Sequence, residues 1–345
     1  MKARLSTTLY RQHSCGWRTM LGGLALLGSL CLAGGTAMAA AGSDPAVGYP
    51  SRPIRFIAPT TPGGANDILP RILGARMTQN WGQQVVVDLR PGAGGIVGTE
   101  VAARATPDGY TLLIVANGYA LNPFLNAKLP YDTLKDLDRV SLVAVAPLVL
   151  VAHPSTPAQS LQELIAFGKS KPGQLNYGTS GLGSGGWLSV ELFKKMTGLR
   201  MTHIPYKGAG QATAAVAGNE VHMLFTSPLA AAPYIKSGRL RALGVTSAKR
   251  VPSMESVPAL AESIPDYEVL NFFGVLVPAG TPKPIISKLN AEINRITSLT
   301  DVKERFAALG FDPVHNTPEQ FNEYVKSEMS KWSAIIREAG IKAEQ

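Results

Sequence analysis

Cysteine is almost absent from this sequence, and charged residues are sparse. Only 2 of the 345 residues are cysteine, Cys15 and Cys31, and both lie within the first 39 residues. The rest of the chain can form no disulfide, and a fold of about 300 residues needs none because it buries enough surface unaided. Charged residues make up 17% and hydrophobic residues 45%, which predicts a globular chain with a large core and excludes disordered and fibrous classes.

Acidic residues are missing from the start of the chain. Residues 1–19 carry four basic side chains, an apolar stretch follows from Met20 to Ala33, and Ala37-Met38-Ala39 supplies small residues. This arrangement predicts a secretory signal peptide over 1–39, cleaved after Ala39. The alternative, a membrane anchor, is disfavoured because an apolar run of about 14 residues is shorter than the ~20 that span a bilayer. The expected product is a soluble, exported, periplasmic protein.

The excess of basic over acidic residues could indicate nucleic-acid binding. Lysine and arginine exceed the acids by 33 − 24 = +9, but four of these positive charges belong to the leader, which leaves +5. The basic clusters typical of a nucleic-acid surface are also missing. We therefore expect no nucleic-acid partner.

Sequence signatures of enzymes are missing as well. No G-x-S-x-G, Walker-type or H-E-x-x-H motif occurs, and the histidines beyond the leader are scattered: His153, His203, His222 and His315. Residues 181–186 fit G-x-G-x-x-G, but the acid expected about 20 residues later is absent from residues 201–210. The sequence predicts no catalytic residue, no metal and no cofactor.

Short apolar stretches alternate with helical patterns along the chain, which favours βαβ units and parallel sheets. The predicted strands are 53–58, 85–89, 111–116, 140–152, 175–178, 201–204, 221–225, 240–245 and 273–277. A helical block follows, over 283–298, 301–309 and 318–339, and the last helix opens with a capping box at Thr317. Two α/β halves with crossings at 140–152 and 273–277 predict two lobes with a cleft between them.

Three predicted strands end in glycine-rich segments that lead into helices: 60–67, 92–98 and 178–186. One such loop is more often a plain turn than a site. Helix N-termini, however, present free N–H groups and partial positive charge. Three of them at strand ends favour an anionic ligand.

The same segments resemble the Bug-type periplasmic binding proteins, the extracytoplasmic receptors of tripartite tricarboxylate transporters. The resemblance rests on Pro62-Gly63-Gly64-x-x-Asp67, Pro91–Gly95, Leu129–Asp132, Asn176–Gly178, Gly181-x-Gly183-Ser184, His203–Gly208 and Pro278–Pro282. It extends from about Tyr49 to Ile341. It implies an α/β, two-lobed (type II-like, Venus flytrap) fold with the ligand cleft between the lobes. The expected lobes are 50–147 with 272–345, and 148–271.

The resemblance also implies where a carboxylate ligand binds. The loop at 60–67 would face the loop at 179–184, and main-chain N–H groups with bound waters would hold one carboxylate. Asp67 cannot bind a carboxylate directly and is expected to hold the loop or a water. The expected ligand-binding residues are Thr60, Thr61, Gly63, Gly64, Asn66, Asp67, Asn117, Gly118, Thr179, Ser180, Gly183, Ser184, Tyr206, Lys207, Gly208, Thr226 and Ser227.

The chain departs from the family pattern at places that bear on the ligand. Trp187 stands where the family usually has histidine, Thr226 stands where an acid often ends a strand, and His222 replaces another usual acid. Because a buried ammonium needs a counter-charge, we expect a ligand without an amino group. Trp187 could line an aromatic ligand or pack in the core.

Three functions remain to be weighed. The first is a monomeric transport receptor that delivers a small organic acid to membrane transporter subunits. The second is a periplasmic sensor that presents its closed form to a signalling receptor. The third, an exported enzyme acting on a carboxylate, lacks a nucleophile and base. We expect a receptor and not an enzyme, although fold alone does not decide between transport and sensing.

Overall fold

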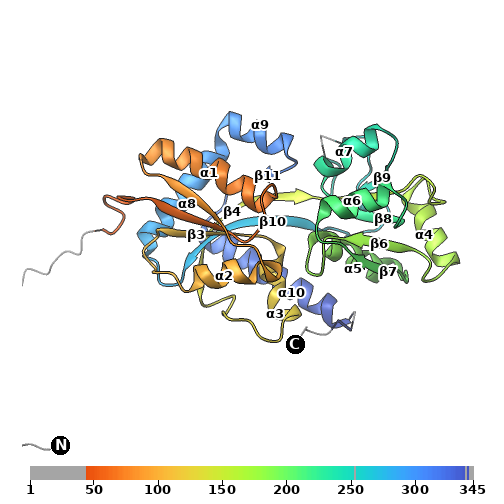
Figure 1. The fold of residues 1–345 in the computed structure, drawn as a ribbon, viewed down its shortest axis with the longest axis horizontal. Coiled ribbons are helices and arrows are strands. Elements are labelled where there is room, and N and C mark those ends of the chain that lie inside the picture. Colours follow the sequence, from red (N-terminus) through yellow and green to blue (C-terminus); the bar gives the residue numbers. More distant parts are fainter. Residues whose placement is uncertain (1–43, 252–253, 339, 342–345) are drawn as a thin grey trace, which may run out of the picture. The chain divides into compact units, whose positions relative to one another are not determined.

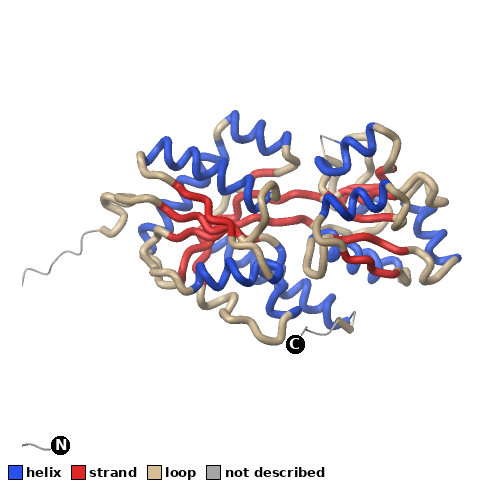
Figure 2. The backbone as a smooth tube through the Cα atoms, viewed as in Figure 1, coloured by secondary structure: helices blue, strands red, loops and turns tan. Residues whose placement is uncertain are grey.

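The computed structural model describes residues 44–251, 254–338 and 340–341, so the predicted signal peptide lies outside the described residues. From Ser43 onward the chain is one compact unit that contains two β-sheets (Figures 1 and 2). No helix of this described part is long and apolar enough to cross a bilayer.

The first sheet has six strands in the order β11-β4-β10-β3-β1-β2. Its strands are β1 (Ile54–Ala58), β2 (Val85–Leu89), β3 (Thr111–Val115), β4 (Leu137–Pro147), β10 (Leu270–Pro278) and β11 (Asp312–Pro313). β1 is parallel to β2 and β3, whereas β10 is antiparallel to β3 and β4. The three parallel strands therefore end at the same edge.

The second sheet has five strands in the order β7-β6-β8-β5-β9. They are β5 (Val149–Ala152), β6 (Asn176–Thr179), β7 (Thr202–Pro205), β8 (Met223–Thr226) and β9 (Arg241–Val245). β6 is parallel to β7 and β8, and β5 is antiparallel to β8 and β9. The expectation of parallel sheets is thus correct for the neighbouring strands β1, β2 and β3 and for β6, β7 and β8, whereas β10 and β5 are antiparallel to the strands beside them.

The prediction of one strand over 140–152 is wrong. β4 and β5 are separated by Leu148 alone and belong to different sheets. Leu148 donates its N–H to Thr246 Oγ1 (2.8 Å) and accepts from the Thr246 N–H (2.8 Å). β10 returns beside this crossing, with Leu270 opposite Pro147. The lobe boundaries expected near 148 and 271 stay a prediction, and the change of sheet at these points supports them.

Helices cover both sheets (Figure 1). They are α1 (Ala65–Trp81), α2 (Ile96–Ala103), α3 (Asn117–Leu125), α4 (Leu161–Ser170), α5 (Gly185–Thr197), α6 (Ala209–Ala217), α7 (Pro228–Lys236), α8 (Lys283–Ser298), α9 (Thr300–Ala308) and α10 (Pro318–Glu338), with 3₁₀ turns η1 (Ala93–Gly95) and η3 (Leu260–Glu262). The capping box at α10 is confirmed, since Thr317 and Gln320 each accept the other's main-chain N–H (3.2 and 2.9 Å). Helix α3 was not predicted, because Gly118 and Pro123 are poor helix formers.

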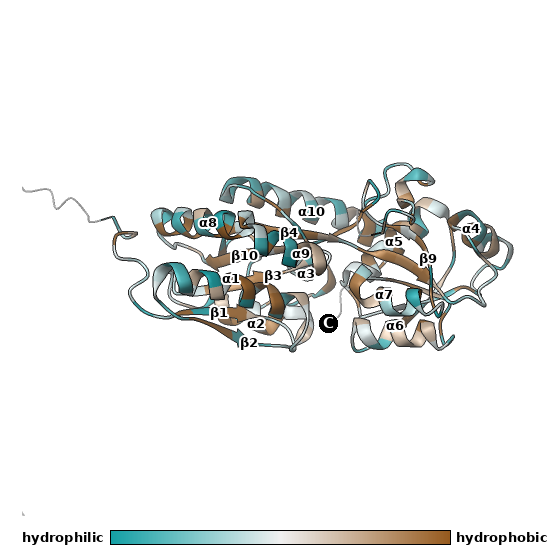
Figure 3. Cartoon of the chain, turned by 90° about the horizontal axis from the view of Figure 1, so that it is seen from above, coloured by the Kyte–Doolittle hydropathy of each residue, from teal (hydrophilic) through white to brown (hydrophobic). Residues whose placement is uncertain are grey.

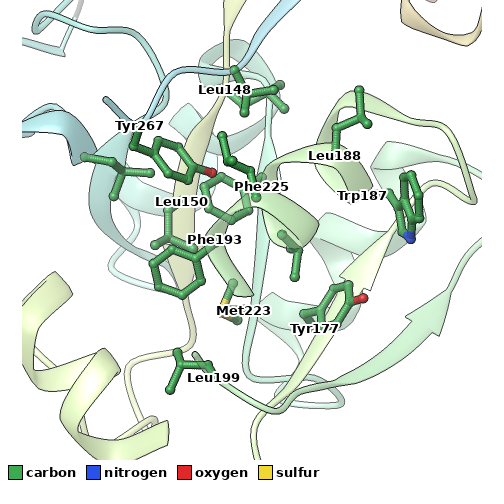
Figure 4. Packing of buried hydrophobic residues seen from close by; sticks show 14 of the residues in the cluster. Leu148, Leu150, Tyr177, Trp187, Leu188, Phe193, Leu199, Met223, Phe225 and Tyr267 are labelled. Carbon is green, nitrogen blue, oxygen red and sulfur yellow. The ribbon is translucent and has the colours of Figure 1, made fainter. Parts of the chain in front are cut away.

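The strands consist mostly of apolar residues, drawn brown in Figure 3, whereas the helices carry more hydrophilic residues. Buried apolar residues of helices and strands form common clusters. One cluster lies around the second sheet and includes Trp187, Phe193 and Tyr267 (Figure 4). Trp187 is 2% exposed, so of its two alternatives the structure supports core packing. The same cluster takes in Trp332 and Ile336 from the end of α10.

Candidate functional site

The parallel strands of each sheet lead into helix N-termini at one edge. In the first sheet β1 runs into α1, β2 into η1 and β3 into α3; in the second, β6, β7 and β8 run into α5, α6 and α7 (Figure 1). Because carboxyl ends of parallel strands share an edge, each sheet brings three such loops together. The expected site residues of these loops therefore fall into two groups, one on each sheet.

The loop after β1 is shaped by Asp67, which is 6% exposed. Its Oδ2 accepts the N–H of Gly63 (2.9 Å), and its Oδ1 accepts from Arg71 Nε (2.7 Å). Gly63 has a φ of +88°, a conformation that favours glycine. Asp67 thus holds the loop, as expected. Gly64 begins α1 without a side-chain cap, which leaves the first main-chain N–H groups of the helix free of intrahelical partners.

Asn117 joins the start of α3 to β10. It is the first residue of α3, its Nδ2 donates to Leu270 O (3.1 Å), and its Oδ1 accepts the N–H of Phe272 (2.9 Å). Both ends of this buried amide are therefore committed to β10. Helix α3 follows Ala116 and has no side-chain cap, so its first N–H groups are also free of intrahelical partners.

In the loop after β6, hydroxyl groups fix the main chain. Ser184 caps α5 by accepting the Trp187 N–H (3.2 Å) and donates to Gly181 O (2.7 Å). Thr179 Oγ1 accepts the Gly181 N–H (3.1 Å) and lies 2.6 Å from His203 Nε2. Ser180 is exposed between them. The hydroxyls of Thr179 and Ser184 thus shape the loop whose residues we expect to bind the ligand.

Behind Thr179 lies a network that sequence reasoning missed. His203 stacks on Tyr177 with ring centroids 5.1 Å apart, and Tyr177 donates its hydroxyl to Glu191 Oε1 (3.0 Å). Lys194 Nζ lies 2.9 Å from both Glu191 oxygens. Partial burial lowers the pKa of His203 and so favours the neutral ring at pH 7. The sequence signal for this network was the pair Glu191 and Lys194, which are three residues apart on the largely apolar helix α5.

The remaining loops of the second sheet differ in exposure. Lys207 is exposed, and Gly208 begins α6 without a side-chain cap. The N–H of Tyr206 donates to Thr179 O (2.9 Å), which ties this loop to the previous one. Thr226 is buried beside Thr213 (Oγ1 to Oγ1, 3.2 Å), and Ser227 caps α7 by accepting the Ala230 N–H (3.2 Å).

The loop after β6 closely approaches elements of the first sheet. A Cβ built on Gly183 would lie 3.1 Å from Leu125 Cδ1 at the end of α3, and one on Gly185 would overlap the side-chain amide of Asn271 in β10. The φ of +72° favours glycine at position 183, whereas a side chain at position 185 would have to displace the Asn271 amide. The structure thus places this second-lobe loop against α3 and β10.

A small cavity of about 50 Å³ lies in the first lobe, at the ends of β1 and β3. Of the expected residues, Asn66 and Gly118 line it. Thr99, Tyr119 and Asn122 also line it. Sequence reasoning did not single out Thr99 or Asn122, although the glycine turn that supplies Gly94 and Gly95 had been noted. Asn66 Oδ1 is buried and has no hydrogen-bond partner among the described residues.

A metal centre finds no support in the part of the chain that the structure describes. No cluster of three or more His, Cys, Asp or Glu side chains suited to a metal ion occurs there. The histidines lie apart from one another and contact other polar residues, as His222 contacts Asn176.

Comparison with known proteins identifies the family. Residues 69–341 match the family model of the tripartite tricarboxylate transporter family receptor. The chain belongs to this receptor family. It is 39% identical over 297 residues to protein BugT of Bordetella pertussis, a match that covers 85% of this chain and 91% of BugT.

Solved structures of the family share the fold. R. palustris Rpa4515 with adipate has a TM-score of 0.79 at 33% identity and covers 86% of this chain and 100% of that one. The periplasmic binding protein BugD has a TM-score of 0.75 at 30% identity, with 86% and 100% covered. MatC from Rhodopseudomonas palustris with bound malate has a TM-score of 0.73 at 29% identity, with 84% and 100% covered. The receptor is accordingly a two-lobed solute-binding protein and not an enzyme.

Proposed function

We propose that this receptor captures a small carboxylic acid between its two lobes and delivers it to the membrane subunits of a tripartite tricarboxylate-type transporter. The protein would act as a monomer in the periplasm after cleavage of its leader behind Ala39. Adipate and malate, which are bound in the structures of two relatives, are both small dicarboxylates.

The observation that carries the proposal is the set of uncapped helix N-termini at the strand ends. Helices α1, α3 and α6 all begin without a side-chain hydrogen bond to their first N–H groups. Such amides, at the positive end of the helix dipole, bind carboxylates readily. We propose that the loop at Gly63 and Gly64 on one side and Thr179 and Ser180 on the other hold one carboxylate through main-chain N–H groups and water. The N–H of Gly63 itself is bound to Asp67 Oδ2 (2.9 Å), so Gly63 would shape the loop.

The charges near these loops suit an anion. The negative charge of Asp67 is paired with Arg71, and Lys207 adds an exposed cation at the start of α6. Charge-assisted hydrogen bonds contribute roughly 1.5–3 kcal/mol each. A few of them, together with lobe closure, supply the about −8.2 kcal/mol of micromolar binding.

The first test is a thermal-shift screen of the purified receptor against mono-, di- and tricarboxylates, aromatic acids and amino acids. A ligand at 100 times its Kd stabilises the fold by about 2.7 kcal/mol, a readily measured shift. Stabilisation by carboxylates and not by amino acids is the expected result. Absence of any carboxylate ligand, with folded and ligand-free protein, would refute the proposal.

Delivery to a transporter needs a separate test. Uptake of the radiolabelled ligand is expected to require both the receptor and the membrane subunits. Uptake that persists without those subunits would instead support the alternative function, a periplasmic sensor for the same ligand.

A further inference from the structure

His203 lies directly behind one of the two loops that the proposed function assigns to the ligand, the loop of residues 179–184. Tyr177 and Thr179 are two residues apart in β6, so their side chains share a face of the sheet. His203 is paired with Tyr177 across the parallel strands β6 and β7 and lies on the same face. The register of the two strands thus brings an imidazole to the residue at which β6 ends and the loop begins.

The contact between His203 and Thr179 is a short hydrogen bond. Nε2 of His203 lies 2.6 Å from Oγ1 of Thr179. A ring carbon could not approach an oxygen so closely, so this contact fixes which edge of the imidazole faces the hydroxyl. The ring of Tyr177 stacks on the imidazole, with centroids 5.1 Å apart and 19° between the planes, and holds it in this position.

The protonation state of His203 decides where the hydroxyl hydrogen of Thr179 is directed. When Nε2 carries no hydrogen, it accepts the hydrogen of the hydroxyl. When the ring is cationic, both ring nitrogens carry hydrogens, so Nε2 donates to Oγ1 and the hydroxyl hydrogen is released to another acceptor. In both states Oγ1 can accept the N–H of Gly181 (3.1 Å), a bond that shapes the loop.

The charges that face His203 come from helix α5 and cancel one another. Glu191 is buried, accepts the hydroxyl of Tyr177 (3.0 Å) and lies 2.9 Å from Lys194 Nζ. β7 is at the edge of its sheet, so β6 is its only neighbouring strand, and α6, which packs at Gly178 on the other face of β6, has no charged residue. Partial burial lowers the pKa of His203, and the free receptor therefore holds the ring neutral at pH 7.

A bound carboxylate would change this balance. Negative charge at the loop of residues 179–184 favours a cationic imidazole behind it, because an opposite charge stabilises the charged form of a nearby group. The attraction is stronger at a partly buried site than in bulk water. His203 is partly exposed, so the proton can come from the solvent. Carboxylate binding and protonation of His203 then favour each other by the same factor.

We propose that His203 is a positioning residue for the ligand loop and that it takes up one solvent proton when a carboxylate binds. In the neutral state it accepts from Thr179. In the cationic state it donates to Thr179, whose hydrogen turns toward Gly181 O, which lies 3.5 Å away. The inference rests on the proposed function and deepens it, since it makes the affinity for the acid rise as pH falls.

The test measures proton uptake on binding. Calorimetric titrations are run in two buffers with different ionisation enthalpies, at about pH 5.5 and about pH 7.5, the range in which histidine titrates. The probes are adipate, malate and the acid with the largest effect in the thermal-shift screen. The unmodified receptor is expected to take up a fraction of a proton per bound acid. Relative to His203→Gln, its affinity should rise about tenfold toward the lower pH, which corresponds to a pKa one unit higher in the complex.

The variant His203→Gln assigns the proton to this side chain. Glutamine can donate to Thr179 or accept from it but does not titrate, so only the acid's own titration, common to all the proteins, is expected to remain. His222→Gln is the matched control. His222 is also partly buried with a lowered pKa, but its Nδ1 accepts the N–H of Asn176 at the opposite end of β6 (3.2 Å). This variant is expected to keep the proton uptake.

The remaining outcomes separate this inference from the proposed function. Equal proton uptake in the unmodified receptor and in His203→Gln would overturn the inference alone, whatever the variant does to stability. Loss of the uptake in His222→Gln and not in His203→Gln would do the same. If His203→Gln does not fold, NMR titration of the histidines in the unmodified receptor replaces it, and no histidine pKa that rises on addition of the acid would overturn the inference. Failure of every carboxylate to bind would refute the proposed function and the inference together.

Discussion

The two lobes form their halves of the site in different ways. In the first lobe, α1 and α3 begin at Gly64 and Ala116, and no side chain caps either helix. In the second lobe, α5 and α7 begin at Ser184 and Ser227, whose hydroxyls already accept main-chain N–H groups, and only α6 begins without a side-chain cap, at Gly208. Helix starts without a side-chain cap thus predominate in the first lobe, and capped helix starts predominate in the second. Changes in the first lobe should therefore act mainly on affinity, and changes in the second partly on stability.

The largest effect is expected for Gly64→Val in the first lobe. A Cβ at Gly64 would lie 3.3 Å from Thr60 Oγ1, and a branched side chain there would cover the free amides of α1. We expect ligand affinity to fall by a factor of 100 or more, as measured by calorimetry. The φ of −83° suits a side chain, so the thermal midpoint should stay within a few degrees. Unchanged affinity would remove this loop from the site.

A smaller loss is expected when the support of that loop is removed. Asp67→Ala deletes the acceptor of the Gly63 N–H and the partner of Arg71. Loss of a capping-type carboxylate costs about 1 kcal/mol, and we expect it to appear in urea unfolding, with about tenfold weaker binding. Full affinity together with reduced stability would show that Asp67 supports the fold and not the site.

The second lobe should respond mainly in stability. Ser184→Ala removes the cap of α5 and the donor to Gly181 O, with an expected cost of about 1 kcal/mol in the free energy of unfolding and a loss of affinity of only a few-fold. Ser227→Ala, the same change at α7, is the matched comparison. If Ser184→Ala abolished binding while leaving stability intact, its hydroxyl would contact the ligand directly, contrary to the contrast between the lobes.

The smallest effect concerns pH. Burial lowers the pKa of His203 and of His222 below their ordinary value near 6.5, so the unfolded chain binds more protons than the folded one as pH falls. The free energy of unfolding should therefore decline from pH 7 toward pH 5. His203→Gln is expected to reduce this slope, whereas His315→Gln, at an exposed position, should leave it unchanged. If the free energy of unfolding declined equally with pH in the unmodified receptor, His203→Gln and His315→Gln, this account would be contradicted.

Much of the fold could be predicted because local signals agreed with it. The capping box at Thr317 and the apolar face of α8 place their helices at or near the observed bounds. Helix α3 could not be predicted, since Gly118 and Pro123 argue against it locally and its contacts with α10 and with both cores support it instead. The break at Leu148 was equally hidden, because both sides of it are buried and apolar.

The sequence predicted which loops form the candidate site. It predicted less well which hydrogen bonds the side chains of these loops make. Glycines and strand ends marked the segments that the structure brings to each sheet edge. They did not show that Asn117 bonds to the main chain of β10, because Leu270 and Phe272 lie far away in the sequence. The bonds of Thr179 and Ser184 to Gly181 are local, but the glycine pattern alone did not indicate them. The orphaned oxygen of Asn66 is visible only when its surroundings are known.

Helix α10 has a consequence for how the molecule can move. Phe321 and Val325 lie in a core of the first sheet, whereas Trp332, Ile335 and Ile336 lie in the core around the second. One continuous helix thus packs into the cores on both sides of the strand crossing. Rotation of one lobe relative to the other would have to bend α10 between Val325 and Trp332, or shift one end of the helix within its core. We therefore expect the last helix, together with the strands that join the lobes, to resist a change in the angle between them.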